Sequence, residues 1–197
     1  EKGFFPKEWT DTYYRDEGKL CGHISHHVPG VEFSTGSLGH GLPVAAGMAL
    51  VAKRLQNKHR IFVLMSDGDC NEGSTWEAIM FAAQHHFDNL TAIVDANKIQ
   101  ALGRVTEVID MEPFAKKVEA FGWAVREIDG HDVEQIESTL KSVPFEKGKP
   151  SFLIARTVKG RGVKDLENTV ASHYRCVPDD KLAEVYEELG VGDAFPV

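Results

Sequence analysis

The stretch 64–73, LMSDGDCNEG, places three carboxylates directly after an apolar run. That run is residues 61–65, IFVLM, and it is followed by Asp67, Asp69 and Glu72 with glycines between them. A short continuous apolar segment is typical of a strand that is buried on both faces of a parallel sheet. In open sheets of this kind, ligands bind outside the carboxyl ends of the strands. The acidic cluster therefore stands where a ligand site is expected.

The rest of the chain alternates predicted strands with predicted helices. Further short apolar segments predict strands at 90–95, 123–128 and 150–157. Apolar residues at helical spacing predict helices over 44–55, 76–87, 114–121, 133–143 and 182–189. This alternation is typical of the α/β class. We expect one domain over residues 1–197, with a three-layer, doubly wound, mostly parallel sheet and helices on both faces.

Composition and charge argue against several classes of function. The formal net charge of -8 over 197 residues is unfavourable for nucleic acid or an anionic membrane as the main partner. No apolar run approaches the roughly 20 residues that span a bilayer. The three cysteines lie far apart without a CxxC pair, which is typical of reduced thiols. We expect a cytoplasmic protein that binds neither nucleic acid nor membrane.

Asp67 and Asn97 are candidate ligands for a divalent cation. They lie 30 positions apart, about one strand-helix-strand unit, and each follows a predicted strand. If the two strands are neighbours, their ends lie roughly 5 Å apart. Carboxylate and amide oxygens suit Mg²⁺ or Ca²⁺ rather than zinc, and the start of a helix near Gly73 suits a diphosphate. The alternative is that Asp67, Asp69 and Glu72 form only a polar loop and a helix cap.

Six motifs resemble the cofactor-binding half of the transketolase family, which uses thiamine diphosphate. They are STGSLGHGLPVAAGMALVAK (34–53), SDGDCNEGSTWEA (66–78), DANKIQALG (95–103), DGHD (129–132), VKGRGV (158–163) and ENTVASHYR (167–175). The resemblance covers nearly the whole chain and is greatest to split transketolases, in which the cofactor domain forms its own polypeptide. It implies the thiamine diphosphate-binding fold, and a further N-terminal segment with more active-site histidines before the point that matches Glu1.

The resemblance implies roles for individual residues. Asp67, the side chain of Asn97 and the backbone carbonyl of Ile99 would bind Mg²⁺, or Ca²⁺ or Mn²⁺ in its place. The catalytic residues would be His23 and His173, because imidazole moves protons well near neutral pH. Glu72 and Glu77 would line a channel between two cofactors. The residues implied to bind thiamine diphosphate are Gly36, Ser37, Leu38, Asp67, Gly68, Asp69, Glu72, Asn97, Ile99 and His173.

The implied activity is that of a transketolase-type transferase. It moves a two-carbon ketol unit from a ketose or ketose phosphate to an aldose. The glutamate that activates the cofactor belongs to a pyrimidine-binding domain, so the resemblance implies a partner subunit of that type in a homo- or heterodimeric or tetrameric assembly. Two alternatives stay open: a related enzyme that uses a 2-oxo acid, as deoxyxylulose phosphate synthases and dehydrogenase E1 components do, and a truncated subunit without catalysis.

The sequence also departs from the family pattern. Ser66 replaces the first glycine of Gly-Asp-Gly, His40 stands where many members have glutamine, and residues 164–166 interrupt a hydrophobic run. Lys159 and Arg161 belong either to a solvated loop or to a phosphate or substrate contact. The remaining histidines are expected to be structural: His26, His27, His85, His86 and His131.

Overall fold

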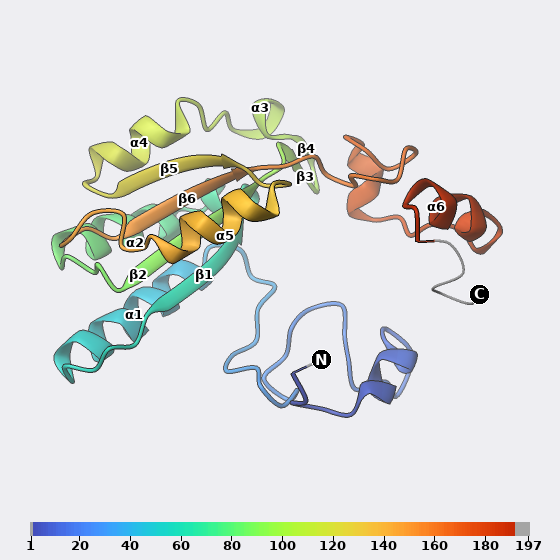
Figure 1. Ribbon diagram of the computed structural model, residues 1–197, viewed down its shortest axis with the longest axis horizontal. Helices are drawn as coiled ribbons and strands as arrows, with labels where there is room; N and C mark the ends of the chain where they lie inside the picture. Colours follow the sequence, from blue (N-terminus) through green and yellow to red (C-terminus); the bar gives the residue numbers. More distant parts are fainter. Residues whose placement is uncertain (1, 192–197) are drawn as a thin grey trace.

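A four-stranded parallel sheet forms the centre of the computed structural model, which describes residues 2–191 (Figure 1). In spatial order its strands are β1 (Ile61–Ser66), β2 (Leu90–Ala96), β6 (Ser151–Arg156) and β5 (Ala124–Asp129). All three pairings are parallel. The structure therefore confirms the α/β class, and each strand end lies within one residue of its predicted position.

Helices cover both faces of this sheet. Three of them belong to one face: α1 (Gly41–Arg54), α2 (Gly73–Gln84) and α4 (Phe114–Ala120), while α5 (Val133–Lys141) lies in front of the sheet in Figure 1. A small antiparallel hairpin, β3 (Ile99–Gln100) and β4 (Gly103–Arg104), follows β2. The remaining helical elements are η1 (Lys7–Thr12), η2 (Gly68–Asn71), α3 (Val105–Val108), η3 (Val170–His173), η4 (Asp179–Lys181) and α6 (Leu182–Glu188).

The main core fills the space between the sheet and α1, α2 and α4. Phe152 of β6 is fully buried there, and its ring meets Phe114 and Trp123 edge-on at centroid distances of 5.6 Å. The indole of Trp123 donates a hydrogen bond to the carbonyl of Ile79 at 2.9 Å, which satisfies its only polar atom. These contacts fix α2 and α4 on the sheet.

Helix α1 buries a stripe of small side chains and exposes its large ones. The residues that predicted this helix include Val44, Met48, Val51 and Leu55, which are 37–69% exposed. The face against the sheet is formed by Leu42, Ala45, Ala46, Ala49 and Ala52. Helical spacing alone therefore identified the helix but not the face that it buries.

The edge strand β1 also carries apolar side chains in solvent. Side chains alternate between the two faces of a strand, so Ile61, Val63 and Met65 point into the main core. Phe62 and Leu64 point to the opposite face and are 44% and 75% exposed. Within residues 2–191, α5 packs against β5 on this side of the sheet, whereas β1 is open there.

The two long irregular segments, 2–40 and 157–181, lie on the side toward which the strands run (Figure 1). The first of these segments carries His23 and the second carries His173. Over the described part of the chain, no helix has the length and apolar character needed to cross a membrane.

Replacing Phe152 with alanine should lower the free energy of unfolding by about 3–5 kcal/mol, because the change leaves a cavity between two aromatic rings. Urea denaturation followed by circular dichroism measures this difference. The matched control is Leu64→Ala on the exposed face of the same sheet, which should change stability by no more than about 0.5 kcal/mol. Equal losses for the two variants would contradict the described packing.

Candidate functional site

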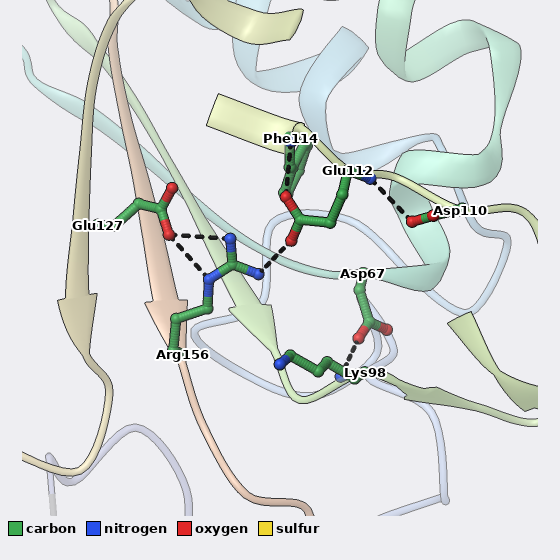
Figure 2. Close-up of polar contacts among 7 residues, drawn as sticks. All are labelled: Asp67, Lys98, Asp110, Glu112, Phe114, Glu127 and Arg156. Atoms are coloured by element: carbon green, nitrogen blue, oxygen red, sulfur yellow. Dashed lines mark hydrogen bonds and ion pairs between the residues drawn. The ribbon is translucent and has the colours of Figure 1, made fainter. Parts of the chain in front are cut away.

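The ends of two neighbouring strands bring the predicted metal ligands together. Asp67 directly follows β1 and Asn97 directly follows β2, and the pairing of Ser66 with Asp95 aligns the two strand ends. Asp67 and Asn97 are only 5% and 8% exposed. The backbone N–H of Lys98 donates a hydrogen bond to Asp67 Oδ2 at 2.7 Å, which ties the end of β2 to the end of β1 (Figure 2). The two strands are therefore neighbours, as the spacing predicted.

The carboxyl of Asp67 is in an unfavourable environment for a negative charge. Burial raises its pKa to about 6, and the nearby charge of Asp95 adds to the shift. The hydrogen bond from Lys98 acts in the opposite direction but does not cancel the cost of burial. A buried carboxylate without an ion pair is stabilised by a cation, so this residue fits a metal ion.

The rest of the predicted ligand set is compatible with Mg²⁺. Asn97 Oδ1 accepts a hydrogen bond from the N–H of Ile99 at 3.0 Å, which holds the amide at the tip of β2, and Ile99 is itself buried. Within residues 2–191, no three His, Cys, Asp or Glu side chains gather as a metal site. One carboxylate with amide and carbonyl oxygens is nonetheless sufficient where phosphate and water complete the coordination.

A glycine turn before α1 lies against the same strand end. Gly36 has a φ of +121°, and the ring of His23 stands 3.0 Å from the position that a Cβ at Gly36 would take. Leu38 Cδ1 stands 3.7 Å from the corresponding position at Gly68. The turn thus places the Leu38 side chain beside Gly68, while Gly36 and Gly68 themselves leave bare backbone that suits close approach of a ligand. The His23 ring contacts this turn at Gly36.

The acidic residues after β1 do not act as helix caps. Neither Asp67 at the start of η2 nor Glu72 at the start of α2 forms a side-chain capping hydrogen bond. The carboxylate of Asp69 instead accepts hydrogen bonds from Gly39 and Ser66. The local sequence alone left capping open, and the structure does not support it.

The segment after β6 places Lys159 within electrostatic reach of both Asp67 and the second predicted histidine, His173. Partial burial, together with the positive charge of Lys159, holds the pKa of His173 below its usual value. The same lysine also lowers the pKa of Asp67, against the larger effect of burial. Tyr174 donates a hydrogen bond from its hydroxyl to the carbonyl of Ala101 at 2.6 Å. His173 is thereby held beside the hairpin that follows Asn97.

His131 supports this arrangement, although the sequence marked it only as structural. Its Nε2 accepts a hydrogen bond from the N–H of Val158 at 2.8 Å, which fixes the chain just before Lys159. Thr157 donates a hydrogen bond to Asp95, near the end of β2. The DGHD motif that contains His131 was the available signal, but a bond to a distant backbone amide cannot be identified from sequence.

An arginine network borders the site on the side of β5 and β6 (Figure 2). Arg156 pairs with Glu112 and Glu127 at 2.9 Å each, and Glu112 also accepts the N–H of Phe114. Arg156, Glu112 and Phe114 line a cavity of about 130 Å³ that Asp67 also lines. No sequence pattern indicated this network, because its three charged members come from separate elements.

The other residues considered from the sequence lie in varied surroundings. Asp165 forms an ion pair with Lys181 at 2.6 Å, so the departure at 164–166 contacts the segment that leads into α6. Glu77 is exposed on α2. The ring of His85 stacks on that of Phe87. The roles of Glu72 and Glu77 in a channel between two cofactors stay predictions.

Comparison with known proteins agrees with the geometry. Residues 11–197 match the family described as "Transketolase, thiamine diphosphate binding domain". An apulose-4-phosphate transketolase subunit of Actinobacillus succinogenes is 43% identical over 190 residues, which cover 96% of this chain and 68% of that protein. The 6-deoxy-6-sulfo-D-fructose transketolase subunit SqwG of a Clostridium species is 39% identical over 189 residues, covering 95% of this chain and 69% of that protein.

The fold is likewise that of a solved transketolase. The crystal structure of transketolase from Campylobacter jejuni superposes with a TM-score of 0.86 at 33% identity, covering 93% of this chain and 30% of that one. The chain spans 65% of the apulose-4-phosphate transketolase subunit from Phocaeicola vulgatus, so it matches only part of its relatives. The strand-end site, the fold and the matched family together show that the chain belongs to the transketolase family as a thiamine diphosphate-binding domain.

Proposed function

We propose that this chain is the cofactor-binding subunit of a split transketolase. With thiamine diphosphate, Mg²⁺ and a pyrimidine-binding partner subunit, it transfers a two-carbon ketol unit from a ketose or ketose phosphate to an aldose. The observation that supports this most strongly is the buried Asp67 carboxylate beside Asn97, at the carboxyl edge of the sheet of a transketolase-family domain.

The proposed cofactor site uses three parts of the chain. Asp67, the amide of Asn97 and the carbonyl of Ile99 would hold the metal ion. The turn of Gly36, Ser37 and Leu38 would lie beside the cofactor, and Gly68 would leave room for the diphosphate. When bound, thiamine diphosphate supplies a carbon nucleophile that makes and breaks bonds next to a carbonyl.

The histidines provide proton transfer at this site. The lowered pKa of His173 favours the neutral imidazole near pH 7, so this side chain can accept a proton from a substrate hydroxyl. His23 lies against Gly36 and is exposed, which leaves its ring free to contact substrate. Both imidazoles can then return protons as the new bond forms.

The substrate is proposed to be an anionic ketose. The names of the two relatives refer to a phosphorylated and a sulfonated sugar. In this chain, Lys159 lies within electrostatic reach of Asp67 and His173, and Arg161 is exposed two positions later. These cations make the loop of residues 158–163 suited to an anionic sugar group.

The surroundings of the site support a partner that covers it. Several large apolar side chains next to the glycine turn, the hairpin and the predicted histidines are more than half exposed: Ile24, Leu38, Leu102 and Tyr174. A cofactor bound to Asp67 would have these side chains around it. Because similar proteins are named as transketolase subunits, we propose that a pyrimidine-binding subunit packs on them in a dimeric or tetrameric assembly.

We also propose that the assembly functions in the cytoplasm. Cys21 and Cys176 are exposed and Cys70 is buried, and all three are free thiols. Burial raises the pKa of Cys70 further above its usual value, so this thiol is inert. Free exposed thiols are compatible with a reducing compartment.

Replacing Asp67 with asparagine should remove metal-dependent cofactor binding while keeping the shape of the side chain. We expect the affinity of the co-purified assembly for thiamine diphosphate with Mg²⁺ to fall by more than about 100-fold, since even residues that only support metal ligands cost 10–100-fold. Isothermal titration measures the change, and Asp165→Asn serves as an exposed control. Unchanged affinity would eliminate Asp67 as a ligand.

The raised pKa of Asp67 predicts a pH dependence of stability in metal-free protein. The folded state holds the proton up to a pH of about 6, whereas the unfolded state releases it near 3.8. The contribution of Asp67 to the free energy of unfolding should therefore fall as pH rises from 4 to 7, by ~3 kcal/mol at most. Denaturation of wild type and Asp67→Asn in EDTA at both pH values measures it. If the difference in free energy of unfolding between the two proteins does not grow from pH 4 to pH 7, the raised pKa of Asp67 is refuted.

The single chain should not catalyse transfer, whereas the chain with its partner should. We expect ketol transfer only after co-expression with a pyrimidine-binding subunit, with thiamine diphosphate and Mg²⁺, assayed on a panel of phosphorylated ketoses. Clear turnover by the purified single chain would contradict the split-subunit proposal. Release of CO₂ from pyruvate by the assembly would instead favour the 2-oxo acid class.

A further inference from the structure

We propose that Asp69, paired with Ser66, is a positioning residue that clamps the glycine turn to the end of β1. In this arrangement Asp69 fixes Gly39 and the strand end relative to each other, and does not itself need to touch the cofactor. The inference rests on the proposed cofactor site for its functional consequence, whereas the clamp itself consists of contacts within the chain.

Both oxygens of the Asp69 carboxylate are engaged by backbone amides from separate segments. Oδ1 accepts the N–H of Gly39 at 2.8 Å, across 30 positions of sequence. Oδ2 accepts the N–H of Ser66, the last residue of β1, at 2.9 Å. Hydrogen bonds to a charged acceptor are about twice as strong as neutral ones. One side chain therefore joins the glycine turn to the residue that precedes Asp67.

Gly39 is held at its carbonyl as well as at its amide. The hydroxyl of Ser74 in α2 donates a hydrogen bond to the Gly39 carbonyl at 2.8 Å. Gly39 is buried with a φ of +76°, and a Cβ there would lie 2.5 Å from both Glu72 Cβ and Ser74 Oγ. The turn can occupy this place only as glycine, and both of its polar groups at Gly39 bind to the segment of residues 69–74.

Ser66 and Asp69 bind each other in both directions. The hydroxyl of Ser66 donates to Asp69 Oδ2 at 3.0 Å and accepts the N–H of Asp69 at 3.1 Å. The Asp69 carbonyl also accepts the hydroxyl of Thr75 at 2.6 Å. A glycine at position 66 would supply neither side-chain bond. The serine that departs from the Gly-Asp-Gly pattern is thus explained as half of a reciprocal pair.

The clamp sets the width of the space that the diphosphate is proposed to occupy. Gly36 to Leu38 lie on one side of it, and Asp67 and Gly68 on the other, with Leu38 close to Gly68. Asp69 forms hydrogen bonds to Gly39, which follows Leu38 on the first side, and to Ser66, which precedes Asp67 on the second. Loss of the carboxylate should let the turn move away from the metal ligands without removing any ligand.

The first test measures the clamp without cofactor. In the co-purified assembly, hydrogen exchange of the Gly39 amide should be at least about 10-fold faster in Asp69→Asn and Ser66→Ala than in wild type, because local opening exposes the amide. The matched control is Asp88→Asn at the opposite edge of the sheet, where the carboxylate accepts the N–H of Gly148 at 3.2 Å. That variant should speed exchange at Gly148 but not at Gly39. Unchanged Gly39 exchange in Asp69→Asn would overturn the clamp.

The second test measures the consequence for the cofactor. Asp69→Asn should weaken binding of thiamine diphosphate with Mg²⁺ by about 10–100-fold, the range found for groups that orient metal ligands. Its kcat at saturating cofactor should stay close to wild type, since no reacting group is removed. Asp88→Asn should leave cofactor affinity unchanged. A positioning role would be contradicted if Asp69→Asn bound thiamine diphosphate as tightly as wild type. It would also be contradicted if the kcat of Asp69→Asn stayed low at saturating cofactor.

A double variant separates the pair from two independent effects. If Ser66 and Asp69 act as one unit, the variant Ser66→Ala/Asp69→Asn should bind cofactor about as weakly as Asp69→Asn alone. If the fold-losses of cofactor affinity in the two single variants multiply in the double variant, the pairing of Ser66 with Asp69 is overturned. If wild-type assembly bound no thiamine diphosphate while Gly39 exchange still responded as expected, the proposed function would fail and the clamp would stand.

Discussion

The burial of the Asp67 carboxylate is the constraint on which the site depends. The Asp67 carboxylate is 5% exposed, and the backbone hydrogen bonds from Lys98 and Gly68 do not offset the cost of burying its charge. Its pKa is therefore raised to about 6. A divalent cation reverses the balance, since it interacts only with the ionised form. The apo protein therefore has a strand end whose electrostatics favour a metal ion, and the parallel pairing of β1 with β2 places the Asn97 amide next to it.

The elements around Asp67 are held by polar contacts rather than by packing. Gly36 and Gly39 both have positive φ, and the Leu38 side chain between them is 51% exposed rather than packed in the core. Its position follows from directed hydrogen bonds to Asp69 and Ser74. On the opposite flank, His131 and Tyr174 hold the Lys159 segment in the same way. This leaves the backbone bare where a diphosphate is proposed to bind, and still fixes it in place.

The sequence predicted those parts of the structure that depend on local pattern. Short apolar runs identified all four strands of the main sheet. The central strands β2 and β6 are apolar because they are buried on both faces, whereas the edge strand β1 is apolar although one of its faces is exposed. The face that α1 buries could not be predicted, because its alanines pack on the sheet and its larger residues point outward. The hydrogen-bond partners of Asp67 and Asp69 could not be predicted either. They are the backbone amides of Lys98 and Gly39, and every residue other than proline carries such an amide. Motif order indicated the site, whereas its internal connections needed coordinates.

The exposed apolar surface bears on how such a domain functions. Val44, Met48 and Val51 on α1, and Phe62 and Leu64 on β1, leave apolar area in water that is costly in an isolated chain. The relatives extend beyond this domain, which covers 30% of a full-length transketolase. In the proposed split assembly, a chain whose cofactor site is rimmed by exposed apolar side chains would gain both stability and a closed site from association with its partner. Cofactor binding and assembly should then be thermodynamically linked, because a partner that packs on the rim stabilises only the arrangement in which the site is formed.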